Sequence, residues 1–205
     1  MWKRTSLIGA STLVALAIAT GCSGSDEPEH PAGHTSSSSA ATAPTASAAA
    51  EAHTDADVMF AQHMIPHHQQ AIEMSDMLLG KQGIDPRVVQ LANQIKAAQG
   101  PEIQQMQDWL TQWGSPAMPP MPGHDMPSMR GMMSDEDMTA LQNAQAVEAS
   151  KLFLTRMIAH HQGAITMAQS EIKDGQYPAA IELSRSIVTS QQKEIDTMKG
   201  ILTTL

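Results

Sequence analysis

Histidine and methionine side chains recur in the same pattern at two places in the chain. The segment MIPHHQQAIEM covers residues 64–74, and MIAHHQGAITM covers residues 157–167, an offset of 93 positions. Imidazole nitrogen binds copper, zinc, nickel and iron, and thioether sulfur favours Cu(I). The repeat therefore offers two similar sets of candidate metal ligands, which are His63, Met64, His67, His68 and Met74 in the first copy and Met157, His160, His161 and Met167 in the second.

A third set of candidate ligands lies between the two copies, in a connector at residues 114–133. Six methionines stand within sixteen residues there, separated by Pro and Gly. A packing role is hard to assign to them, because no continuous helical face can form in such a segment. Thioethers bind Cu(I) without losing a proton, whereas the alternative is an exposed loop whose methionines react with oxidants. The candidates here are Met118, Met121, His124, Met126, Met129, Met132 and Met133.

Each copy places its histidines and methionines on the apolar face of a helix. At about 100° per residue, they fall on the same side as Phe60, opposite the polar residues, so we expect this face to point into the core. The adjacent His67 and His68 diverge by about 100°, so one helix cannot easily hold a single ion with both. One histidine of each pair is therefore a candidate for a structural role. The second copy carries Arg156 at the position of His63.

A second repeat accompanies the first at an offset of 92. QGPEIQQM at residues 99–106 aligns with QQKEIDTM at residues 191–198. Glu102 and Glu194 share the apolar faces of their helices, and a buried carboxylate without a partner costs several kcal/mol. We expect both to contact the inward histidines, where they either orient imidazole ligands of a metal or form a metal-free network that fixes the register of the helices. The residues that this repeat places around the site are Gln99, Glu102, Met106, Gln191, Glu194 and Met198.

Helical spacing of apolar residues dominates residues 54–205, and no segment alternates as a strand would. A helical stretch beginning at Ser134 is expected to break around residues 143–146, and Asp85-Pro86 is a good helix start. The main helices are predicted at 57–80, 86–113, 147–174 and 178–202. Two hairpins that cannot bury their apolar faces alone should pair. The predicted fold class is therefore all-α, a four-helix bundle made of two repeated helical hairpins.

With these motifs the chain resembles the family named domain of unknown function 305, whose signature M-I-x-H-H-x-x-A-I-x-M occurs twice. The resemblance covers about residues 57–205. It implies a ferritin-like helical bundle. CopM-type members of that family are exported copper-binding proteins, so the resemblance also implies copper as the metal. Cu(I) is favoured, with Cu(II) or another transition metal as alternatives.

The first residues have the pattern of a bacterial lipoprotein signal peptide. Lys3 and Arg4 precede an apolar run too short to span a membrane, and small residues lead to Cys22, the only cysteine. We expect cleavage after residue 21 and lipid on Cys22, which would anchor the protein to the outer face of the bacterial cell membrane or place it in the periplasm. The Ser-, Ala-, Thr- and Pro-rich residues 22–53 are expected to form a disordered tether to a domain at residues 54–205.

Charge and motif content narrow the function classes. A formal net charge of −9 argues against nucleic acid as a partner. Di-iron oxidases on helical bundles use Glu-x-x-His pairs, but the only such spacing here is Glu27 to His30, in the tether. We therefore expect a copper-binding and buffering protein rather than an enzyme, with a copper-transfer protein or a second copy of the chain as candidate partners. The alternatives are a metal-free structural or interaction bundle and, less favoured, a metal-dependent oxidase.

Overall fold

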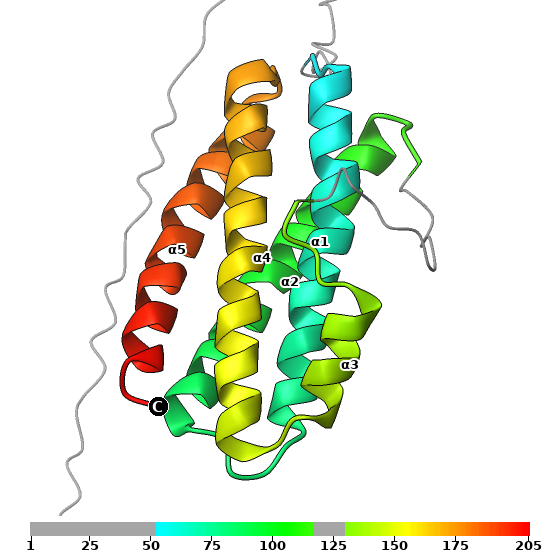
Figure 1. The fold of residues 1–205 in the computed structure, drawn as a ribbon. Coiled ribbons are helices and arrows are strands. Elements are labelled where there is room, and N and C mark those ends of the chain that lie inside the picture. The colour runs from blue at the N-terminus through cyan, green and yellow to red at the C-terminus, as the bar shows by residue number, and fades with distance from the viewer. Residues whose placement is uncertain (1–51, 117–129) are drawn as a thin grey trace, which may run out of the picture. The chain divides into compact units, whose positions relative to one another are not determined.

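The computed structural model of the protein describes residues 52–116 and 130–205, in which the only regular secondary structure is α-helix (Figure 1). The predicted all-α class is therefore confirmed. An interruption at residues 144–145 separates α3 from α4, where a break was expected. The helices are α1 at Asp55–Leu79, α2 at Pro86–Gln112, α3 at Asp135–Asn143, α4 at Ala146–Asp174 and α5 at Pro178–Leu202.

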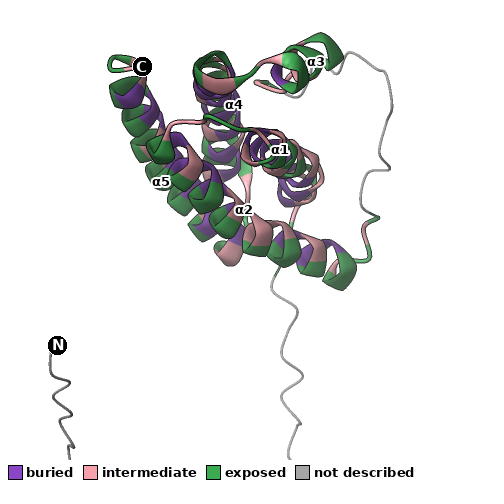
Figure 2. Ribbon diagram, turned by 90° about the horizontal axis from the view of Figure 1, so that it is seen from below, coloured by how far each residue is buried: buried purple, intermediate pink, exposed green. Residues whose placement is uncertain are grey.

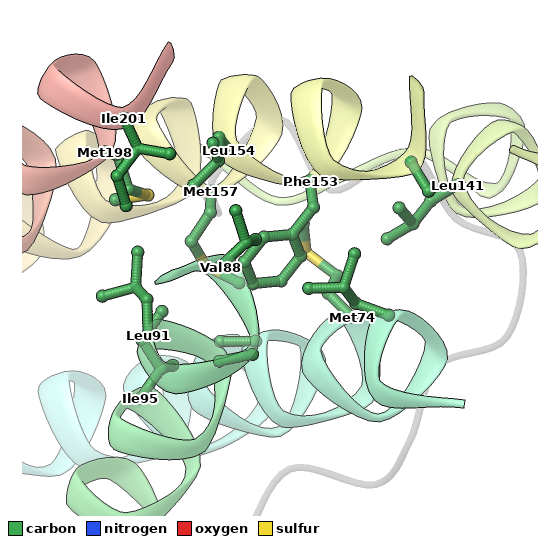
Figure 3. Packing of buried hydrophobic residues seen from close by; sticks show 14 of the residues in the cluster. Met74, Val88, Leu91, Ile95, Leu141, Phe153, Leu154, Met157, Met198 and Ile201 are labelled. Carbon is green, nitrogen blue, oxygen red and sulfur yellow. The ribbon is translucent and has the colours of Figure 1, made fainter. Parts of the chain in front are cut away.

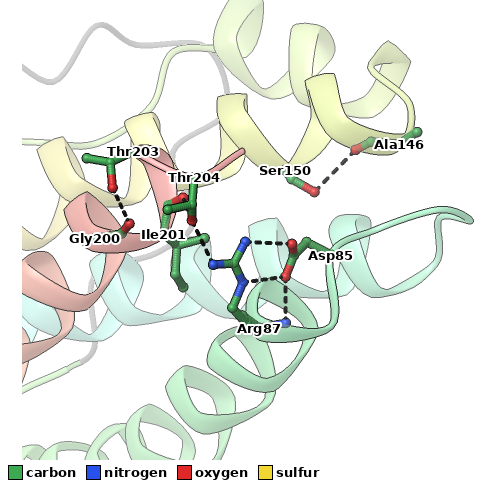
Figure 4. Close-up of polar contacts among 8 residues, drawn as sticks. All are labelled: Asp85, Arg87, Ala146, Ser150, Gly200, Ile201, Thr203 and Thr204. Carbon is green, nitrogen blue, oxygen red and sulfur yellow. Dashed lines mark hydrogen bonds and ion pairs between the residues drawn. The ribbon is translucent and has the colours of Figure 1, made fainter.

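Local sequence signals set the starts of the first two helices. Thr54 and Asp57 form a capping box at α1. At α2 the carboxylate of Asp85 accepts a hydrogen bond from the backbone N–H of Arg87. The Arg87 guanidinium pairs with the same carboxylate and also donates to the Thr204 hydroxyl, which lies just beyond α5 (Figure 4). These contacts join the start of α2 to the end of α5.

The helices pair into two hairpins, α1 with α2 and α4 with α5, and α1 packs along α4 (Figure 1). α1 and α4 run in opposite directions, so the middle of one lies against the middle of the other. The short α3 contacts both of these helices. The four long helices form the predicted bundle, and the two copies of the histidine motif meet at its centre.

Apolar side chains form two core clusters. One contains Met74, Val88 and Phe153 (Figure 3), and the other contains Phe60 and Met106. Figure 2 shows that buried residues gather on the inward faces of the helices. Each large apolar side chain that is fully buried stabilises the fold by about 1.5–3 kcal/mol. The motif histidines of α1 lie in the chain between the residues that α1 contributes to the two clusters.

Several predictions fall on residues outside the described parts of the chain. These are the signal peptide at residues 1–21, the lipid on Cys22 and nearly all of the tether. The same holds for much of the connector, namely Met118, Met121, His124, Met126 and Met129. Among the described residues, no helix has the length and apolar character needed to cross a membrane.

Candidate metal-binding site

Two imidazoles from equivalent positions of the repeat meet at the centre of the bundle. His67 of α1 and His160 of α4 are both fully buried, and their ring centroids lie 3.7 Å apart with an angle of 36° between the ring planes. The antiparallel packing of α1 on α4 brings them together, since each lies near the middle of its helix. The two repeats therefore share one histidine pair at their interface.

The second histidine of each motif is bound to a glutamate of its own hairpin. Nε2 of His68 lies 2.7 Å from a carboxylate oxygen of Glu102, and Nε2 of His161 lies 2.6 Å from one of Glu194. The predicted contact between inward histidines and these glutamates is confirmed. The expectation that the carboxylates are buried needs a correction, because the Glu102 and Glu194 side chains remain 18% and 20% exposed. Water can therefore solvate the outer part of each carboxylate, which lowers the cost of its charge.

The central imidazoles are held in the neutral form. Burial first, and then the neighbouring His68, lower the pKa of His67 to about 3. Burial likewise lowers the pKa of His160 well below its usual value, with His67 as the next cause. Nε2 of His67 lies 3.2 Å from the backbone carbonyl oxygen of Arg130, which can only accept. Nε2 therefore carries the proton, and Nδ1 of His67 has a free lone pair.

Five ring nitrogens of this group have no hydrogen-bond partner among the described residues. They are Nδ1 of His67, His68 and His161 and both nitrogens of His160. A buried polar atom without a partner costs about 1–3 kcal/mol, so folded proteins rarely retain several together without a use for them. Neutral imidazole nitrogen is a ligand for copper, zinc and other transition metals.

The methionines of the motifs lie mainly in the apolar clusters. Met64 and Met106 are fully buried in one cluster, and Met74, Met157 and Met198 belong to the other. Their contacts make them core residues, whatever else they do. Two predicted ligands are less deeply placed than expected for the apolar face, because His63 and Met167 are only partly buried. His63 stands at the edge of the helix face, which explains its exposure.

The glutamines of the second repeat are buried at matching places in α2 and α5. Gln99 is 2% exposed and Gln191 is 3% exposed. Neither amide atom of the Gln99 side chain has a partner within the described residues, and the same is true of Oε1 of Gln191. The connector methionines Met132 and Met133 are partly buried, and Met133 packs against the cluster that contains Met74.

The histidines do not converge as metal ligands in this arrangement. Within residues 52–116 and 130–205, no group of three or more His, Cys, Asp or Glu side chains is placed so that it could hold a metal ion. The ring centroids of His67 and His160 lie 3.7 Å apart, with an angle of 36° between the ring planes. The donor types fit copper, but their present placement does not form a closed coordination sphere.

A buried carboxyl pair near one end of the bundle was missed in the sequence. Asp57 of α1 accepts hydrogen bonds from the backbone N–H groups of Gln176 and Tyr177 at 3.0 and 2.8 Å. Burial would raise the pKa of Asp57, but hydrogen bonds, first from Thr54, lower it to about 2. Burial and then the neighbouring Asp57 carboxyl group raise the pKa of Glu171 to about 8. On the helical wheel used for the histidines, both residues fall within about 40° of the motif's first methionine, so a signal existed.

The fold and its repeated histidine motif define a helical-bundle family. The family model of the domain of unknown function DUF305 matches residues 57–202. The chain therefore belongs to the DUF305 family. No curated protein matches the chain.

Solved structures of other proteins share this fold. A DUF305 fragment from Deinococcus radiodurans is 34% identical with a TM-score of 0.68, over 74% of this chain and 98% of that one. A DUF305 protein from Streptomyces coelicolor is 32% identical with a TM-score of 0.66, over 72% of this chain and 91% of that one. CopM in its Cu(II)-bound form is 34% identical with a TM-score of 0.64, over 72% of this chain and 96% of that one. CopM has also been solved in Cu(I)-bound and Ag-bound forms.

Proposed function

We propose that this protein binds and buffers copper, through histidine and methionine, without catalysing a reaction. The observation that carries the proposal is the group of four buried histidines, five of whose ring nitrogens have no hydrogen-bond partner in the described parts of the chain. His67 and His160 are neutral imidazoles, because burial lowers the pKa of each, and neutral imidazole suits copper in both oxidation states. The family relationship to CopM, solved with Cu(I) and with Cu(II), supports copper over other transition metals.

The two histidine pairs have different roles in this proposal. His67 and His160 supply imidazole ligands at the interface of the repeats. His68 and His161 are structural, because each already uses Nε2 in a contact with a glutamate. A small movement of the His160 ring would bring one of its nitrogens to a metal ion, since neither has a hydrogen-bond partner in the part of the chain that the structure describes.

The methionines complete the proposal by favouring Cu(I). Thioether sulfur is a soft ligand that needs no deprotonation, and the connector has the highest density of it in the chain. We assign the connector sites to Cu(I) and the central imidazoles to either oxidation state. The proposed soft ligands are Met118, Met121, Met126, Met129, Met132 and Met133, together with His124.

The proposed place of action is outside the cytoplasm. The sequence before the bundle has the features of a lipoprotein signal peptide ending at Cys22. The Streptomyces coelicolor relative, whose own secretion is a prediction, agrees with export. A protein held there by lipid could store copper or deliver it to a copper-transfer protein, and a second copy of the chain is the other candidate partner.

A metal-free bundle is the second candidate function. It is favoured by the two histidine–glutamate contacts and by the lack of a converging three-ligand group in the described residues. In that case the buried polar groups serve to fix the register of the helices.

Anaerobic titration with Cu(I) against a competing chelator distinguishes these functions. We expect the double variant His67→Gln/His160→Gln to lose the imidazole-dependent sites. The matched double variant His68→Gln/His161→Gln should keep them and lose stability instead. A wild-type protein that takes no copper from the chelator would contradict the proposal and favour the metal-free function.

A further inference from the structure

Positions 70 and 163 are equivalent in the two repeats but carry different residues, and both contact the end of the connector. The side-chain amide of Gln70 donates from Nε2 to the carbonyl oxygen of Met133 at 2.9 Å. Its Oε1 accepts from the backbone N–H of Met133 at 2.7 Å. One side chain thus satisfies both backbone groups of Met133, as a neighbouring strand would do.

Gly163 of α4 has no side chain, and this allows the end of the connector to pack directly against the helix backbone. A Cβ atom at this position would lie 1.8 Å from the carbonyl oxygen of Arg130 and 2.8 Å from the Cα of Gly131. Gly131 has a φ of +86°, and a Cβ there would lie 2.7 Å from the carbonyl oxygen of Ala159. Glycine at both positions is what allows the two backbones to approach this closely. The segment Arg130–Met133 therefore rests directly on α4, beside His160.

This placement decides which nitrogen of His67 is free. The Arg130 carbonyl oxygen lies 3.2 Å from Nε2 of His67 and can only accept a hydrogen bond. The proton therefore sits on Nε2, and the buried Nδ1 has no partner within the described residues. A carbonyl that accepts from one nitrogen of a metal-binding histidine orients the ring and makes the other nitrogen a better ligand. His160 has no such contact, since both its nitrogens are without partners there.

We propose that Gln70 and Gly163 are positioning residues, which hold the segment Arg130–Met133 so that the Arg130 carbonyl orients His67 and leaves Nδ1 as its ligand atom. This inference rests on the proposed function for the identity of His67 as a ligand. It adds that only one of the two central histidines is oriented in advance. It also places the last two methionines of the connector, Met132 and Met133, in the segment that orients the imidazole.

The test follows the Nε2–H proton of His67 by NMR, in the full protein labelled with ¹⁵N-histidine. Gly163→Ala would displace the segment, and Gln70→Ala removes its two hydrogen bonds without adding bulk. In both variants this proton should exchange with solvent about tenfold faster or more, because local opening loses one or two hydrogen bonds. Gly200→Ala is the matched control, since no atom of the described residues lies within 4 Å of a Cβ added there.

The Nε2–H protons of His68 and His161 serve as internal controls because they are held by glutamates instead of by the segment. They should keep their wild-type exchange rates in every variant. Unchanged exchange at His67 in both variants would overturn the inference. Equal acceleration at all three histidines would also overturn it, because that result reports a general loss of stability.

Silver(I), a soft diamagnetic ion, separates this inference from the proposed function. Added Ag(I) should shift Nδ1 of His67 in the wild type and should bind about tenfold more weakly or worse in both variants. If Ag(I) shifts no nitrogen of His67 in the wild type while exchange behaves as expected, the ring is positioned but the proposed metal role of His67 fails. If Ag(I) shifts Nδ1 equally in all variants, metal binding stands and the positioning inference fails.

Discussion

The α1–α2 hairpin and the α4–α5 hairpin carry the same histidine–glutamate contact, at 2.7 Å for His68 and Glu102 and at 2.6 Å for His161 and Glu194. In each case the histidine is fully buried and the glutamate is about one-fifth exposed. The agreement extends to the centre, where equivalent histidines of the two repeats touch. The two hairpins are therefore alike in their histidine–glutamate contacts, whereas at the centre Nε2 of His67 meets the Arg130 carbonyl oxygen and the nitrogens of His160 have no partner among the described residues.

The hairpins differ where each of them turns. Asp85 caps its own helix α2, but Tyr177 at the start of α5 makes no side-chain cap. Asp57 of α1 accepts from the Tyr177 backbone N–H instead. Beside it, Glu171 occupies the position that Leu78 has in the first repeat. The end of the bundle near Tyr177 therefore contains the carboxyl pair Asp57 and Glu171, whereas the first repeat has the apolar Leu78 at the position of Glu171.

The two repeats carry the same residues where they contact each other and different residues where they contact the connector. The central histidines pair with their own equivalents, so a change in one alters the contact of both. The chain has only one connector, so the two positions that receive it cannot be alike. Gln70 binds the connector backbone and Gly163 makes room for it. The substitutions below exchange a residue of one repeat for its equivalent, remove a contact that both repeats share, or change a feature that has no counterpart in the other repeat.

The largest effect is expected from Gly163→Gln, which gives the second repeat the residue of the first. The new side chain would collide with the backbone of Arg130, because even a Cβ would lie 1.8 Å from its carbonyl oxygen. The free energy of unfolding should fall by at least about 3 kcal/mol, as for severe overpacking. Urea denaturation measures this. Gly200→Gln, at an open position of α5, should show no such loss, and a small loss at Gly163 would mean that the connector yields easily.

The second largest effect is expected at the two glutamates that contact histidines, because they occupy equivalent positions in the two hairpins. Glu102→Ala and Glu194→Ala each leave a buried histidine without its partner, which should lower the free energy of unfolding by about 2–3 kcal/mol. Replacement by Gln should cost less, since the amide oxygen can still accept from Nε2. Thermal unfolding of the four variants measures the effects. Markedly unequal losses at the two positions would show that the hairpins are not energetically equivalent.

A smaller effect should appear as a pH dependence that belongs to one end of the bundle only. The pKa of Glu171 is raised from 4.5 to about 8 in the folded protein. Its neutral form is therefore favoured by folding, and this stabilisation is complete below pH 4.5 and is lost as the pH rises through about 8. Between pH 5 and pH 8 the wild type should lose about 1–2 kcal/mol relative to Glu171→Gln, allowing for screening by solvent. Parallel pH profiles of the two proteins in urea denaturation would refute the carboxyl pair.

The smallest effect on stability is expected in the connector. Changing Met118, Met121, Met126 and Met129 to Leu keeps apolar bulk and removes sulfur, so the free energy of unfolding should change by less than about 0.5 kcal/mol. Cu(I) stoichiometry should nevertheless fall, because soft ligands are lost. Met133 is left unchanged because it packs against the core. An unaltered stoichiometry would leave the copper proposal resting on the bundle alone.

The helices and the histidine–glutamate contacts could be predicted from the sequence, because they depend on the local spacing of apolar and polar residues. The helix starts followed from caps and prolines, such as Asp85 before α2. The contacts of Glu102 and Glu194 with histidines followed from finding a charge on an apolar face, which requires a partner. The same rule applied to Asp57 and Glu171 would have found the carboxyl pair. His63 lies at the edge of the apolar face and is only partly buried.

The sequence by itself determined the helices, the faces that they bury and the twofold repeat, because these depend on residues a few positions apart on one helix. Only the tertiary structure decided that α1 and α4 pack antiparallel and bring His67 against His160. It also decided which backbone crosses Gly163 and which carbonyl meets His67. The sequence around Gly163 does not indicate which segment packs against it. The close approach that this glycine permits depends on where the segment at Arg130, more than thirty residues away, returns to the bundle.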